Sequence, residues 1–160
     1  MKKVTILLAT ALALGPSACD EGLAPVPFQG ISGAVTYSGS VPDSTDWVRV
    51  AAFDDLPQTE IDLLNFAAIS NELFPLEDST QYVVDLDTGV YQWLPVVWKK
   101  ADTPLSPDAL RVLGWYTNGN APFDTPRPVS IESGQEAGNT DIIADYDNAM
   151  TIAEALEAIR

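Results

Sequence analysis

The chain contains no histidine, a single cysteine and only eight basic residues among its 160. Without histidine it lacks the side chain that most often serves as a general base and as a ligand of zinc or copper. One cysteine cannot form an internal disulfide. The 23 acidic residues give a formal charge of −15. A surface this acidic repels a phosphate backbone, so we expect no nucleic-acid partner.

Sequence patterns of catalysis are also missing. The chain has no glycine-rich phosphate loop and no serine in a nucleophile elbow. Catalysis by a pair of carboxylates needs a defined spacing and perturbed pKa values, and no pair among the 23 acids stands out. We therefore expect a protein that is not an enzyme and that needs no cofactor for catalysis.

The longest apolar run, residues 4–14, is too short to span a bilayer. It follows the basic residues Lys2 and Lys3 and is ended by Gly15 and Pro16. A short basic segment, an apolar run of this length and a helix-breaking end are typical of a secretory signal peptide. The sequence thus predicts export.

Small residues, Ser17 and Ala18, come directly before Cys19. This arrangement resembles the lipobox of bacterial lipoproteins, which implies cleavage after Ala18 and lipidation of Cys19. Residues 1–18 are then the signal peptide, and residues 19–27 form the lipidated cysteine and a polar, proline-containing tether. The predicted location is the periplasm or the cell surface, with the protein anchored to a membrane by its lipid.

The charge supports a covalent form of attachment. Removing residues 1–18 also removes two lysines, which leaves six basic and 23 acidic residues and a formal charge of −17. Such a surface repels anionic lipid headgroups, so electrostatic attraction cannot hold the protein at a membrane. Beyond the membrane, we expect an envelope protein or a glycan as the partner.

From residue 28 onward, short β-prone runs alternate with turn residues, as in an all-β sandwich. Residues 87–89 (Asp-Thr-Gly) predict a bulged hairpin turn between two of these runs. We predict one mainly-β domain over residues 28–147, a single antiparallel sandwich of seven strands. The runs are residues 28–37, 47–53, 82–86, 90–98, 110–116, 128–131 and 140–144.

Two segments have helical periodicity. Residues 58–70 carry an apolar stripe that predicts an inserted helix covering a sheet edge. Residues 148–160 predict a short C-terminal helix, in which Thr151 and Glu154 fit a capping box. So short a helix is stable only when its apolar face packs against the sandwich.

The order of runs and turns is similar to a known family. Its pieces are residues 33–39, 48–53, 82–91 and 128–131, with an aromatic residue shortly after Gly89. Together they resemble the carboxypeptidase-regulatory-like, transthyretin-like (prealbumin-like) sandwich of many exported bacterial lipoproteins. The resemblance implies an Ig-like/transthyretin-like fold. Its motifs shape turns and core, and none of them carries a catalytic residue.

Two binding hypotheses remain beside a structural or interaction role. Asp141, Asp145 and Asp147 lie close in sequence and offer oxygen ligands for calcium, although they are equally suited to point to solvent or to cap the last helix. Trp98 and Trp115 are the tryptophans expected to be exposed, where a flat ring could stack on a sugar, although tryptophan in strands is usually buried. The alternatives are thus a calcium-stabilised adhesion-type domain and a carbohydrate-binding module.

Overall fold

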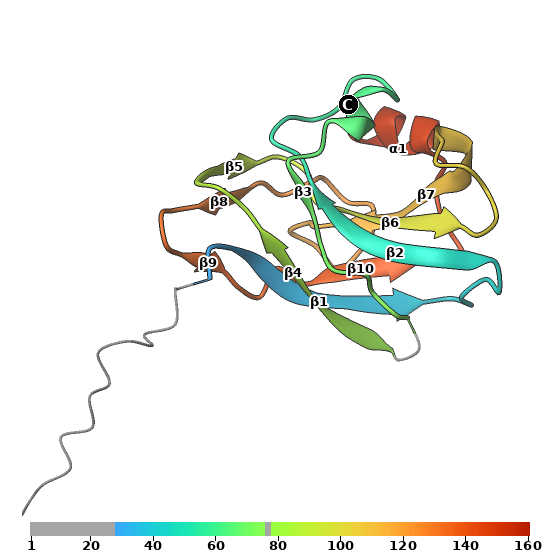
Figure 1. Ribbon diagram of the computed structural model, residues 1–160, viewed down its shortest axis with the longest axis horizontal. Helices are drawn as coiled ribbons and strands as arrows, with labels where there is room; N and C mark the ends of the chain where they lie inside the picture. Colours follow the sequence, from blue (N-terminus) through green and yellow to red (C-terminus); the bar gives the residue numbers. More distant parts are fainter. Residues whose placement is uncertain (1–27, 76–77) are drawn as a thin grey trace, which may run out of the picture.

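The computed structural model describes residues 28–75 and 78–160. Two four-stranded sheets face each other, a two-stranded sheet extends one end, and a helix lies on the outside of one layer (Figure 1). The predicted signal peptide, cleavage site at Ala18, lipidated Cys19 and tether (residues 19–27) lie outside the described residues.

The first sheet is centred on β1 (Gly30–Ser38). The strand β1 pairs antiparallel with β4 (Ser79–Asp85) and parallel with both β9 (Glu136–Ala137) and β10 (Ile142–Asp145). The second sheet has the order β3 (Ala68–Ile69), β2 (Thr45–Ala52), β6 (Pro95–Lys100) and β7 (Leu110–Trp115). The small third sheet joins β5 (Gly89–Tyr91) to β8 (Val129–Ile131).

The main core fills the space between the two large sheets. Alternation along β2 turns Val48 and Val50 inward, and both side chains are fully buried. They meet Ile31 and Val35 of β1 in one cluster. Burial of one face of each strand fixes the register of strand pairing, because a slip of one residue would turn all the inward-facing apolar side chains toward solvent.

A second apolar cluster lies on the outer face of the β2–β6–β7 sheet, under the helix α1 (Ile152–Ala158). Trp93 and Trp115 form its centre, with ring centroids 5.9 Å apart and an edge-to-face arrangement. Ile152 and Leu156 of α1 pack on it and are buried. The second sheet is therefore apolar on both faces.

The mainly-β prediction is confirmed, but the expected count of seven antiparallel strands is not. Residues 28–75 and 78–160 form ten strands in three sheets, and two of the pairings of β1 are parallel. The three additional strands arise because the predicted run 90–98 divides into β5 and β6 and because β3 and β9 were not predicted. β3 and β9 are only two residues long, too short to show a period in the sequence. The predicted hairpin at residues 87–89 is also wrong, since β4 pairs with β1 and β5 with β8.

The inserted helix predicted for residues 58–70 is wrong. The structure has a single 3-10 turn, η1 (Asp62–Leu64), followed by β3. Backbone pairing with β2 overrides the helical pattern, because the N–H groups of Ser70 and Leu73 donate to the carbonyls of Val50 and Val48. A segment whose donors are used by a neighbouring strand cannot also form a helix.

The predicted C-terminal helix is confirmed. α1 begins after Thr151, whose hydroxyl accepts a hydrogen bond from the Glu154 N–H, while the Glu154 carboxylate accepts one from the Thr151 N–H at 2.8 Å. These bonds hold the pKa of Glu154 below its usual value. A second 3-10 turn, η2 (Pro107–Ala109), precedes β7.

We expect the fold to lose stability above about pH 10 because of its buried tyrosines. The Tyr82 hydroxyl donates to the Thr140 carbonyl at 2.6 Å, and burial raises its pKa well above the ordinary value of 10.0. Below pH 10 the side chain is neutral in both states. Above it, the unfolded chain releases the proton and the folded protein does not, so stability falls as the pH rises.

Tyr82→Phe is expected to cost about 1–2 kcal/mol at pH 7, through the lost hydrogen bond, and to lessen the decline above pH 10. Urea unfolding at pH 7 and pH 10.5 measures both effects. Burial also raises the pKa of Tyr146, so part of the decline should remain in the variant. An alkaline decline identical to that of the wild type would show that Tyr82 does not cause it.

Candidate functional site

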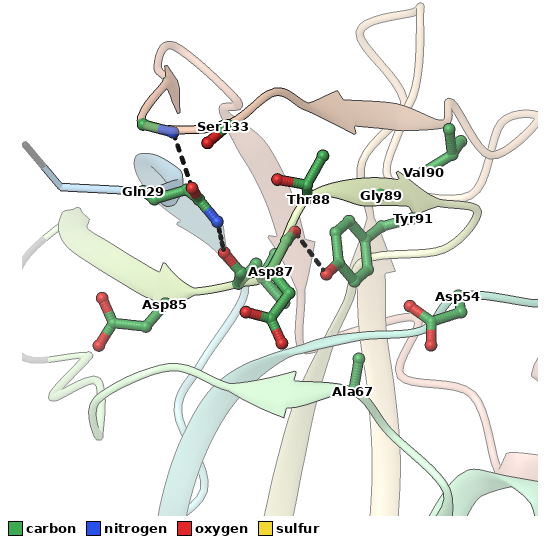
Figure 2. Close-up of a pocket in the computed structure, with 12 residues that line it drawn as sticks. Gln29, Asp54, Ala67, Asp85, Asp87, Thr88, Gly89, Val90, Tyr91 and Ser133 are labelled. Carbon is green, nitrogen blue, oxygen red and sulfur yellow. Dashed lines mark hydrogen bonds between the residues drawn. The ribbon is translucent and has the colours of Figure 1, made fainter.

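The surface of the described residues has several hollows, and two of them differ in chemistry, because one is lined by many polar residues and the other almost wholly by apolar ones. The first, here named the polar cavity, has a volume of about 1040 Å³ and lies around the turn between β4 and β5 (Figure 2). Its lining consists of Gln29, Asp54, Ala67, Asp85, Leu86, Asp87, Thr88, Gly89, Val90, Tyr91, Ser133 and Gly134.

Hydrogen bonds in the polar cavity hold its loops together. Gln29 bridges two of them, because its amide donates to the Leu86 carbonyl at 2.9 Å and accepts from the Gly134 N–H at 2.7 Å. The Tyr91 hydroxyl donates to the Asp87 carbonyl at 2.9 Å. Burial raises the pKa of this tyrosine above its ordinary value. These contacts are structural, and the carboxylates of Asp54, Asp85 and Asp87 are exposed.

The second hollow, here named the apolar groove, has a volume of about 140 Å³. It lies on the outer face of the second sheet, where alternation points every other residue of β2 outward. The segment around η1 forms one wall, and α1 contributes Ile152. Its lining consists of Trp47, Arg49, Ala51, Phe53, Leu63, Leu64, Phe66, Ile69, Trp93, Val97, Leu105, Leu110, Val112 and Ile152.

Four large side chains that line the apolar groove are themselves exposed. Leu64 and Leu105 are each 61% exposed, Phe66 is 42% and Ile69 is 40%. We call these four residues the rim. Single exposed apolar residues are common, but several grouped around an apolar hollow are typical of a binding surface.

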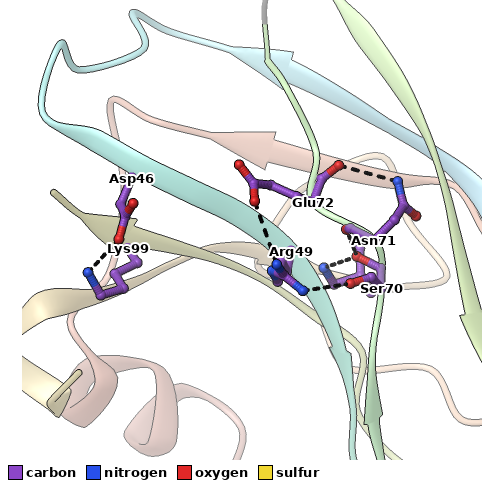
Figure 3. A network of polar contacts seen from close by, with 7 residues as sticks. Asp46, Arg49, Ser70, Asn71, Glu72 and Lys99 are labelled. Carbon is purple, nitrogen blue, oxygen red and sulfur yellow. Dashed lines mark hydrogen bonds and ion pairs between the residues drawn. The ribbon is translucent and has the colours of Figure 1, made fainter.

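Among the described residues that line the groove, Arg49 alone carries a charge. Its guanidinium lies over the Trp47 ring, 5.7 Å from the centroid. It donates to the Ser70 carbonyl at 3.3 Å and pairs with the Glu72 carboxylate at 3.6 Å (Figure 3). Both contacts are long for charge-assisted hydrogen bonds, which usually measure 2.7–2.9 Å.

A second polar group belongs to the groove. Trp93 is buried, and no acceptor for its indole N–H is found in the described part of the chain.

A second cation, Lys99, lies on β6, the strand that pairs with β2. It donates to the Asp46 carboxylate at 2.6 Å (Figure 3). Lys99 does not line the groove, so the described lining of the groove combines apolar side chains with one cation, Arg49.

The expectation that Trp115 is exposed is wrong. It is 1% exposed because it packs in the second cluster under α1, and its indole donates to the Asp124 carbonyl. Trp98 is half-buried, packs against the main core and donates to the Thr45 hydroxyl at 2.8 Å. The two rings therefore belong to opposite faces of the second sheet and do not form one flat surface.

Two of the three aspartates considered for calcium accept hydrogen bonds within the fold, and the third, Asp147, donates its backbone N–H to one of them. Asp141 accepts a hydrogen bond from the Ala34 N–H of β1 at 2.9 Å. Asp145 accepts from the Asp147 N–H and from the Asn148 side chain, which shapes the turn after β10. Across residues 28–75 and 78–160, no group of three or more Asp, Glu, Cys or His is placed to hold a metal ion.

Sequence reasoning missed the apolar groove. It assigned Ile61, Leu64 and Ala68 to the apolar stripe of a helix. The structure instead leaves Ile61, Leu64, Phe66 and Ile69 exposed. One signal in the sequence was available: several large apolar residues lie close together in a segment flanked by acidic residues. It could not be interpreted without knowing that β3 pairs with β2.

Comparisons of the chain with protein-family models, with curated proteins and with solved structures found no match. Within the described residues, no helix has the length and apolar character needed to cross a membrane.

Proposed function

We propose that the protein is an exported, lipid-anchored envelope protein whose sandwich is a non-catalytic binding module, with the apolar groove as its binding site. Two kinds of observation support the proposal. Residues 1–19 have the pattern of a lipoprotein leader that ends in Cys19. The folded domain combines a groove lined almost wholly by apolar side chains with an exposed apolar rim.

The rim is the observation on which the binding role depends. Fully burying one large apolar side chain contributes about 1.5–3 kcal/mol, so partial burial of four such residues gives a partner a substantial gain. A secreted acidic protein has no folding reason to expose Leu64, Phe66 and Leu105 together. Their exposure is explained if a binding partner covers these side chains.

The polar groups with displaced pKa values fit a non-catalytic role. Backbone hydrogen bonds from Thr59 and Gln58 lower the pKa of Asp62, and these bonds fix the start of η1. Glu154 has the corresponding role at the start of α1. In both cases the carboxylate stabilises a local turn of backbone.

The finer fold assignment is part of the same proposal. We infer that the sandwich is of the Ig-like, transthyretin-like kind, on the strength of the similar order of runs and turns over residues 33–131. The carbohydrate alternative is less favoured, because Trp98 and Trp115 belong to opposite faces of the second sheet.

Site-specific photo-crosslinking in the producing cell tests the binding role. A benzophenone amino acid in place of Leu105 should give an ultraviolet-dependent adduct. The same group in place of Val83 should give none, because Val83 is 45% exposed on the outer face of the first sheet and does not line the groove. Adducts of equal yield at both positions, or none at Leu105, would contradict the proposal.

A further inference from the structure

We infer that the apolar groove binds the alkyl chain of a single-chain anionic amphiphile, such as a fatty acid, with the carboxylate beside Arg49. The inference rests on the proposed function, since it names the ligand class of the same site. Three features of the groove support it: its size, its lining and the sign of its one charge.

The size fits an alkyl chain better than a folded partner element. An enclosed apolar volume of about 150 Å³ holds a group the size of benzene. The groove's 140 Å³ therefore accepts a few methylenes of a chain. The remainder can lie along the rim, where Leu64, Phe66 and Leu105 continue the apolar surface outward.

The lining excludes most polar ligands. Aromatic rings of Trp47, Phe53 and Trp93 form one part of the groove, and the aliphatic side chains of Val97 and Val112 form another. A polar ligand placed there would lose its hydrogen bonds to water without gaining partners. An alkyl chain loses nothing polar and removes apolar surface from water.

The charge points to an anion. The chain has 23 acidic and eight basic residues, yet the charged residue in the groove's described lining is an arginine. Its contacts to Ser70 and Glu72 are long, and guanidinium can bind a carboxylate through two parallel hydrogen bonds. A ligand carboxylate at normal distance would therefore replace weak contacts with strong ones (Figure 3).

The charge of Arg49 also favours a free carboxylate over two other possible occupants of the groove, a peptide segment and an acyl chain on Cys19. An apolar peptide segment without an acidic side chain has no group to match Arg49. An acyl chain attached to Cys19 has its carboxylate consumed in the ester or amide bond. A free long-chain carboxylate satisfies both the groove and the cation.

Titration with three ligands of equal chain length tests the inference. The protein is the full chain with Cys19→Ser, which carries no acyl group, and the ligands are decanoate, decanol and decyltrimethylammonium below their micelle concentrations. Calorimetry and tryptophan fluorescence report binding, since Trp47 and Trp93 line the groove. Decanoate should bind at one saturable site, about tenfold more tightly than decanol, with the cation weakest.

Two pairs of matched variants locate the site. Val97→Trp fills the groove and should abolish decanoate binding, whereas Val83→Trp on the other sheet should not change it. Arg49→Gln should reduce the affinity for decanoate to that for decanol. Arg127 also lies over an aromatic ring, Tyr116, at 5.4 Å, but it does not line the groove. Arg127→Gln should therefore leave the affinities for decanoate and for decanol unchanged.

Several outcomes would overturn the inference. They are absence of decanoate binding, equal affinity for decanoate and decanol, tighter binding of the cation, or equal effects of Arg49→Gln and Arg127→Gln. A crosslink from Leu105 to a protein without decanoate binding would reject this ligand class and keep the binding module. Loss of both the crosslink and decanoate binding would reject the module as well.

Discussion

Cys19→Ala is expected to abolish incorporation of labelled fatty acid and to move the protein from the membrane fraction to the soluble fraction. The reason is that the lipid is the proposed means of attachment, with each buried methylene contributing about 0.8 kcal/mol. Nothing replaces it electrostatically, because the chain after Ala18 has a formal charge of −17.

The control for this change is Ser17→Ala, which keeps a small residue in the cleavage region and leaves the cysteine in place. It should label and fractionate as the wild type does. Equal labelling of the wild type and Cys19→Ala would show that the cysteine is not the acylated residue. Retention of Cys19→Ala in washed membranes would show that another contact holds the protein there.

Gly33→Ala is expected to destabilise the fold by about 3 kcal/mol or more, or to prevent folding. A Cβ at residue 33 would lie 2.3 Å from the Thr140 carbonyl oxygen and 2.6 Å from its carbon. Thr140 cannot move away, because three hydrogen bonds fix it. Its N–H donates to Ser32, its hydroxyl donates to Ala137, and its carbonyl accepts from Tyr82.

Gly138→Ala is the matched control, because Gly138 lies in the connection between β9 and β10 that also contains Thr140. A Cβ there would meet its nearest atoms at 3.8 Å, which is ordinary contact. Urea unfolding should give a midpoint near the wild-type value for Gly138→Ala and a much lower one for Gly33→Ala. Similar midpoints for the two variants would mean that β1 and the Thr140 backbone are less closely packed than described.

Local signals in the sequence predicted local structure well. The capping box of Thr151 and Glu154 predicted the start of α1, because both partners lie within one turn. The β-prone run of residues 47–53 predicted β2, since the residue types of a strand can be read from one segment alone. Neither inference needs knowledge of what the element packs against.

Long-range pairing could not be predicted in the same way. The pattern of residues 58–70 favoured a helix, but the unused edge of β2 captured Ser70 and Leu73 as strand partners. The turn at residues 87–89 has suitable residues for a hairpin, yet β5 pairs with β8, about forty residues away. The pairing of β3 with β2 places Ile69 beside the apolar groove, so the candidate site could not be predicted from the sequence.

The central claim is that a lipid on Cys19 anchors a binding domain to a membrane of the cell envelope. Intact-mass measurement of the native protein, extracted from membranes with detergent, tests it most directly. We predict a chain that begins at Cys19 and carries the added mass of acyl groups. A chain that begins at Met1, or one that begins at Cys19 without added mass, would contradict the account.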